Sequence, residues 1–144
     1  MKLLLPVDGS PSAKNGIYKS KEAGLFNNAE VHLLTVNTTS SDIPASPYMA
    51  LNMMNEITAA NKQRALDVLN EAKEILSPDY HVHAEILREG DPAMEILRYA
   101  EEIQADLIIM GNRGLGRFNK ILMGSVSHKV LTNSDCSVLI VKEK

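Results

Sequence analysis

Uninterrupted apolar runs of four or five residues constrain the fold of this chain more than any other feature of its sequence. The runs LLLPV (3–7), LIIM (107–110) and VLIV (138–141) contain no charged or hydroxyl-bearing side chain. A strand with one face in water alternates apolar and polar residues, whereas a strand covered on both faces loses that alternation. The three runs therefore predict strands of a parallel sheet that has helices on both faces.

Longer amphipathic stretches separate these strands and predict helices between them. We expect helices after Ser10-Pro11, over 51–76, after Asp91-Pro92 and over 125–133, with an exposed loop over 37–50. The strands are expected at 2–7, 30–36, 81–87, 106–110 and 137–141. Because alternating strands and helices form right-handed crossovers between parallel strands, we predict an α/β fold: one domain over residues 1–144 with an open, doubly wound, five-stranded sheet.

Charge, hydropathy and cysteine content exclude several classes of protein. The formal net charge of −3 argues against broad nucleic-acid binding, which requires lysine and arginine over a large face. No apolar run approaches the ~18 residues of a membrane-spanning helix, and the first seven residues are too few for a signal peptide. We therefore expect no membrane contact and a cytoplasmic location. Cys136 is the only cysteine, which favours a buried apolar role over a catalytic thiol.

The segment after the fourth strand, GNRGLGRFNKILMGSVS (111–127), carries the strongest chemical signal. Its glycines let backbone N–H groups converge on an anion, and the helix that begins near Ser125 adds unpaired N–H groups and a positive dipole end. Open α/β sheets bind ligands at the carboxyl ends of their strands. We predict a phosphate-binding cradle here, with Arg113, Arg117 and Lys120 close to it. A glycine-rich surface loop with solvated charges is the alternative.

Two common phosphate-binding motifs are absent from this segment. The P-loop pattern GxxxxGK[ST] does not occur, and GxGxxG fails because Gly114 and Gly116 are followed by Asn119. A P-loop NTPase and a dinucleotide-dependent dehydrogenase are both disfavoured.

Across nearly its whole length the chain resembles the ATP-binding branch of the universal stress protein family. The resemblance rests on LLLPVDGSP (3–11), LLTV (33–36), GDPAMEIL (90–97), CSVLIV (136–141) and the spacing Gly111-x2-Gly114-x9-Gly124-Ser125. It implies the strand order 3-2-1-4-5, which puts the ends of the first and fourth strands side by side. The residues after those strands, Asp8 and Gly111, are then expected to cluster.

The resemblance also implies a role for individual residues in binding ATP, or AMP or ADP. Pro6, Asp8 and the main chain of Val36 would meet the adenine, and Met110 and Gly111 the ribose. The residues that would hold the phosphates are Gly114, Gly124, Ser125 and Val126, with Arg113 close to them. Mg²⁺ would accompany ATP where ATP is the ligand, and no catalytic residue or protein-held metal is expected.

Asp8 has two alternative roles on chemical grounds. A carboxylate at a strand end can accept a hydrogen bond from an exocyclic amine or a ribose hydroxyl, or it can cap the first helix. The place expected for Asp8 at the adenine end leaves it too far from the γ-phosphate to act as a base or a Mg²⁺ ligand.

We predict a nucleotide-dependent switch or sensor in the stress response. A slow ATPase or phosphotransferase is the alternative, but catalysis needs a positioned base and usually a carboxylate for Mg²⁺, and the glycine segment supplies neither. An assembly module with an empty pocket would show a degraded glycine pattern, whereas the pattern here is complete.

The remaining chemical side chains are predicted to have ordinary roles. His81 and His83 lie on one face of an expected strand, but no third metal ligand is evident, and exposed edge-strand histidines are the preferred interpretation. We expect His32 to be packed and His128 to lie on the surface, with an approach to the nucleotide as the alternative.

Two surfaces are candidates for contacts with other molecules. Met49, Met53 and Met54 could form a lid or partner surface, although an ordinary core stripe is the preferred interpretation. The last strand, 137–141, lies at the sheet edge in the resembling fold, where an uncovered apolar strand invites pairing. We therefore expect a homodimer joined through this strand.

Overall fold

The computed structural model describes residues 1–38, 47–77, 79–115 and 123–143, with only the backbone described for 47–50. Its elements are β1 (Lys2–Pro6), α1 (Pro11–Glu22), β2 (Glu30–Asn37), α2 (Pro47–Leu76), β3 (Val82–Glu89), α3 (Pro92–Ile103), β4 (Leu107–Gly111), α4 (Ser125–Asn133) and β5 (Ser137–Val141). The five strands form one sheet in the order β3-β2-β1-β4-β5, and every pair is parallel. The predicted fold class and strand order are therefore confirmed.

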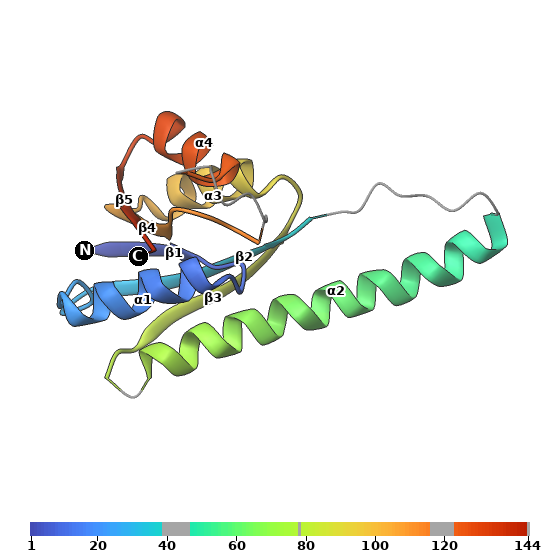
Figure 1. Cartoon of the computed structure of the whole chain (residues 1–144), viewed down its shortest axis with the longest axis horizontal. Helices are drawn as coiled ribbons and strands as arrows, with labels where there is room; N and C mark the ends of the chain where they lie inside the picture. Colours follow the sequence, from blue (N-terminus) through green and yellow to red (C-terminus); the bar gives the residue numbers. More distant parts are fainter. Residues whose placement is uncertain (39–46, 78, 116–122, 144) are drawn as a thin grey trace.

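The sheet is covered on both faces, as the apolar runs predicted (Figure 1). Helices α1 and α2 lie on one face, where Leu3 and Leu5 of β1 pack in one core with Leu69 of α2. Helices α3 and α4 lie on the other face, where Leu4 packs in a second core with Ile96 of α3. Successive residues from Leu3 to Leu5 thus enter opposite cores, which is why this part of β1 has no polar position.

Side-chain caps fix where two helices begin. The Ser10 hydroxyl accepts a hydrogen bond from the Ala13 N–H at 3.1 Å, and the Asp91 carboxylate accepts one from the Met94 N–H at 2.9 Å. The hydrogen bond from Met94 lowers the pKa of Asp91 below its ordinary value. Both caps precede a proline at the start of the helix, as predicted from the Ser10-Pro11 and Asp91-Pro92 pairs.

Helix α2 differs from its prediction at its N-terminal end. It begins at Pro47 rather than at residue 51, so the end of the expected loop is helical; residues 39–46 of that loop lie outside the described part of the chain. Figure 1 shows the N-terminal half of α2 extending beyond the sheet. Met53 and Met54 are accordingly exposed. The core-stripe interpretation was wrong for these two methionines, because no helix or strand among the described residues packs over them. The side chain of Met49 is not described.

Among the described residues, no helix combines the length and the hydropathy that a bilayer crossing requires. Cys136 is half-buried rather than fully buried and packs against the second core.

Candidate functional site

A cavity of about 820 Å³ opens at the carboxyl ends of β1, β2 and β4. This is the point at which the strand order reverses, where open α/β sheets characteristically bind ligands. The structure brings all ten of the predicted site residues to this one cavity: Pro6, Asp8, Val36, Met110, Gly111, Arg113, Gly114, Gly124, Ser125 and Val126 line it. Their individual contacts to a ligand stay predictions.

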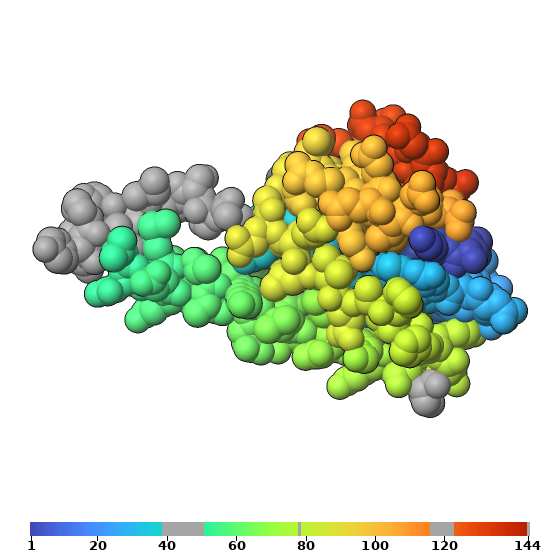
Figure 2. Space-filling view, turned by 180° about the vertical axis from the view of Figure 1, so that it is seen from behind, coloured from blue at the N-terminus to red at the C-terminus, as the bar shows by residue number. Residues whose placement is uncertain are grey.

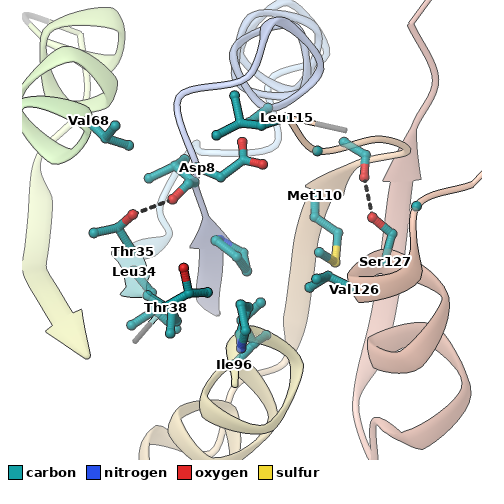
Figure 3. A pocket seen from close by; sticks show the side chains of 18 of the residues that line it. Asp8, Leu34, Thr35, Thr38, Val68, Ile96, Met110, Leu115, Val126 and Ser127 are labelled. Atoms are coloured by element: carbon teal, nitrogen blue, oxygen red, sulfur yellow. Dashed lines mark hydrogen bonds between the residues drawn. The ribbon is translucent and has the colours of Figure 1, made fainter. Parts of the chain in front are cut away.

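The walls of the cavity are largely apolar. Figure 3 shows Leu34 of β2, Met110 near the end of β4 and Ile96 on α3 around the opening, with Val68 of α2 on the far side. Apolar side chains that converge on a space with few polar groups are typical of sites for a planar, drug-sized ligand. The cavity therefore provides room and chemistry for an aromatic base.

Asp8 is the only carboxylate among the described residues that line the cavity. Its Oδ1 atom accepts a hydrogen bond from the Ser10 N–H at 2.9 Å, while Ser10 itself caps α1. The helix-cap alternative for Asp8 was therefore wrong, because the hydroxyl two residues later has that role. Asp8 is exposed, and its second oxygen faces the cavity region occupied by Gly114.

The structure brings Asp8 close to one of the glycines predicted to hold the phosphates. A Cβ placed on Gly114 would lie only 2.9 Å from Oδ2 of Asp8. The loop after β4 turns back across the end of β1, so that the carboxylate and the glycine become neighbours. The distance of Asp8 from the γ-phosphate of a bound nucleotide stays a prediction.

The glycines of this segment are required for different reasons. A Cβ on Gly111 would overlap the Ser12 hydroxyl oxygen and lie 2.7 Å from the Ser12 carbonyl group, so this glycine permits α1 to approach β4. At Gly124 a Cβ would have its nearest contacts at 3.5 Å, from the Arg113 Cα and the Gly114 N. Packing of the described residues thus demands Gly111 but leaves room for a side chain at Gly124.

Asn112 holds the start of the glycine segment in place, a role that the sequence analysis missed. Its side chain is buried, and its Oδ1 atom accepts hydrogen bonds from the Ser12 hydroxyl and the Glu143 N–H, both at 3.1 Å. The Asn112 carbonyl accepts from the Gly124 N–H at 2.7 Å. No pattern in the sequence distinguishes this asparagine from a solvent-exposed loop residue.

The N-terminal turn of α4 faces the cavity without a side-chain cap. Gly124 is the N-cap residue and has no side chain that could accept from the first N–H groups of the helix. Ser125, Val126 and Ser127 all line the cavity, and the Ser127 hydroxyl donates to the Gly111 carbonyl at 2.9 Å (Figure 3). The helix end is thus held against β4, with its N–H groups available to an anion.

Two arginines supply positive charge to the cavity. Arg113 was predicted here, and its buried Nε atom has no hydrogen-bond partner among the described residues. Arg64 of α2 also lines the cavity and was missed, because only the packing of α2 against β2 brings it to the strand ends. Arg117 and Lys120 lie outside the described residues.

The predictions for two of the histidines can be compared with the structure. His128 is exposed and does not line the cavity, as the preferred interpretation had it. His32 is buried, and its Nδ1 atom is 2.9 Å from the Tyr99 hydroxyl oxygen, so its predicted packing is confirmed.

The strand order, the cavity at the switch point and the glycine segment define the class of this protein. It is a doubly wound α/β protein with a ligand cavity at the carboxyl ends of its strands. The chain matches the model of the Universal stress protein family over residues 1–142, and it belongs to that family. It is 34% identical over 146 residues to the universal stress protein YxiE of Bacillus subtilis, which covers 98% of each chain.

Solved structures share the fold. The structure of protein MJ0577 matches with a TM-score of 0.83 and 30% identity, covering 99% of this chain and 96% of that one. A universal stress protein in complex with cAMP matches with a TM-score of 0.68 and 23% identity, covering 98% of this chain and 96% of that one. A family member from Arabidopsis thaliana with AMP bound has a TM-score of 0.64 and 19% identity, covering 100% and 92%.

Proposed function

We propose that this universal stress protein binds an adenine nucleotide, ATP or a close relative, in the cavity at the carboxyl ends of its strands and acts as a nucleotide-dependent switch. The observation that carries the proposal is the polarity of the cavity. Apolar walls from β2, α2 and α3 lie at one side, while the glycine segment and the uncapped start of α4 lie at the other. A nucleotide has the same division between base and phosphates.

The phosphate side combines three kinds of anion-binding group. Backbone N–H groups of α4 face the cavity, the Ser125 side chain lines it, and Arg113 adds charge from the glycine segment. Arg64 adds a second cation to the same cavity from α2. Hydrogen bonds that involve an ionised partner are about twice as strong as neutral ones, so we expect affinity to rise with the number of phosphates.

The choice of adenine is supported by the family. A relative with cAMP and another with AMP share this fold, and both ligands contain adenine. At 23% and 19% identity these structures support the class of ligand rather than particular contacts.

Calorimetric titration of the chain with ATP, ADP and AMP tests the proposal. Arg64→Gln removes a cation at the cavity, and we expect it to weaken ATP binding about tenfold, or ~1.4 kcal/mol. The matched control is Arg98→Gln, which removes the same charge from α3 at a position outside the cavity. Gly114→Val should abolish binding with the fold intact, because a Cβ at this position lies 2.9 Å from the Asp8 carboxylate and within 4 Å of no other atom beyond its chain neighbours among the described residues.

Two results would contradict the proposal. One is that none of the three nucleotides binds the unaltered chain. The other is that Arg98→Gln weakens binding as much as Arg64→Gln does, since a general charge effect rather than the cavity would then explain the affinity.

A slow ATPase is the second candidate, and the closeness of Asp8 to Gly114 favours it. A carboxylate beside bound phosphates can hold Mg²⁺. Among the described residues that line the cavity, however, no second acid or histidine accompanies Asp8 as a base. We therefore favour binding with slow turnover.

We further propose that the protein forms a homodimer through β5. This strand is at the edge of the sheet and pairs only with β4 among the described strands, and its Leu139 side chain is exposed. Edge strands with exposed apolar side chains favour pairing with a second chain.

A further inference from the structure

Three potential metal ligands meet at the opposite end of the sheet from the nucleotide cavity. Glu30 and His32 come from β2 and His83 from β3, and one ligand atom of each lies within 4.8 Å of the other two. None of the three lines the cavity. In Figure 2 the start of β2, in light blue, lies beside the start of β3, in yellow-green, at the surface of the molecule.

An irregularity in the strand pairing brings the third ligand to this cluster. Glu30 and His32 are two residues apart on β2 and therefore share a face. In β3, Val82 pairs with Val31 and Ala84 with His32, so the register shifts and His83 is an extra residue between the two pairs. A bulge of this kind redirects a side chain. His83 consequently lies against Glu30 and His32, with the two imidazole ring centroids 5.1 Å apart.

The distances between the ligand atoms suit a small divalent cation. Oε1 of Glu30 is 3.0 Å from Nε2 of His32 and 3.5 Å from Nε2 of His83. Around a tetrahedral Zn²⁺ with bonds of ~2.0–2.1 Å, neighbouring ligand atoms are about 3.3 Å apart. The cluster therefore needs only small side-chain adjustments to enclose such an ion.

Tyr99 provides the second hydrogen bond that a metal-binding histidine requires. Its hydroxyl oxygen lies 2.9 Å from Nδ1 of His32. With a metal on Nε2, Nδ1 carries the proton, and this N–H group donates a hydrogen bond to the Tyr99 oxygen. The hydrogen bond fixes the tautomer and the orientation of the ring. Tyr99 lies on the buried face of α3, with the Arg88 guanidinium 5.4 Å from the centre of its ring.

We propose that Glu30, His32 and His83 form a binding site for a divalent transition metal of the Zn²⁺ class. The ligand set of two imidazoles and one carboxylate is typical of zinc sites that retain an open coordination position for water. The exposure of the side chains agrees, since His32 is 6% exposed while Glu30 and His83 are 37% and 55% exposed. The buried histidine anchors the ion, and the open position faces solvent. Bound metal would join edge strand β3 to β2.

Titration of the nucleotide-free chain with Zn²⁺ by calorimetry tests this site, with Co²⁺ absorption as a report of coordination geometry. We expect one ion per chain. His83→Ala and Glu30→Gln alter exposed side chains and leave the fold intact, and each should weaken Zn²⁺ binding by at least about tenfold. The matched control is His81→Ala, which removes an exposed histidine two residues away that does not belong to the cluster. It should bind as the unaltered chain does.

Other outcomes would overturn the proposal. If the chain binds no Zn²⁺ below ~1 mM, the three side chains form only an ion-paired network. Equal affinity in His83→Ala, or an equal loss in His81→Ala, would assign the binding to surface histidines in general. A Co²⁺ spectrum identical to that of the free aqueous ion would also refute it.

Discussion

Replacing Gly111 with alanine tests whether the first glycine of the segment is required for the packing of α1 against β4, independently of any ligand. The new Cβ would overlap the Ser12 hydroxyl oxygen and lie 2.7 Å from the carbonyl carbon and oxygen of Ser12. These atoms belong largely to the backbone of α1, which cannot rotate away as the end of a long side chain can. The helix must therefore shift away from β4.

The size of the effect follows from two contributions. Overpacking of a well-filled interior costs ~1–3 kcal/mol. A shift of Ser12 also weakens the hydrogen bond between its hydroxyl and Asn112, which is 3.1 Å long and buried, for about 1 kcal/mol more. We expect the free energy of unfolding to fall by about 2–4 kcal/mol.

Urea unfolding followed by circular dichroism measures this loss, and with slopes of ~1–3 kcal/mol/M the midpoint should fall by about 0.7–4 M. Gly124→Ala is the matched control, because its Cβ meets nothing closer than 3.5 Å and its backbone has φ −70° and ψ 158°. That variant should change the free energy of unfolding by no more than about 1 kcal/mol, because the lower entropy of the unfolded chain and the poorer N-cap propensity of alanine oppose each other. If Gly111→Ala is as stable as Gly124→Ala, the close approach of α1 does not constrain the glycine.

Two further predictions concern turnover and assembly. In a single-turnover assay with excess protein, ATP should be cleaved far more slowly than the ~1–100 s⁻¹ of kinases. The reason is that no base accompanies Asp8 among the described cavity residues. If ATP were consumed within seconds and Asp8→Asn abolished this activity, the protein would be an ATPase. Light scattering should find a dimer that Leu139→Lys converts to a monomer, since a charge on the exposed face of β5 opposes pairing. A monomer at all concentrations of the unaltered chain would refute the dimer.

Local sequence determined the elements and their layering. The run from Leu3 to Val7 could only be a strand covered on both faces, and its residues do enter two cores. Ser10 and Asp91 marked the starts of α1 and α3, because a side-chain cap acts within three residues. The cradle residues Arg113, Gly114, Gly124 and Ser125 were predicted from their own chemistry, whereas the strand order and the roles of Pro6, Val36, Met110 and Val126 came from the resemblance to a family.

Only the tertiary structure decided which distant side chains meet. Asp8 lies beside Gly114 because the loop after β4 crosses the end of β1, and Arg64 reaches the cavity because α2 packs on the sheet. Neither contact leaves a periodic signal in the sequence. The same holds for His83, whose neighbours on β2 depend on a one-residue shift in strand register. A sequence pattern indicates what a residue does within its own helix or strand. Contacts between distant side chains depend instead on how the helices and strands pack, and many sequences achieve the same packing with different residues at these positions.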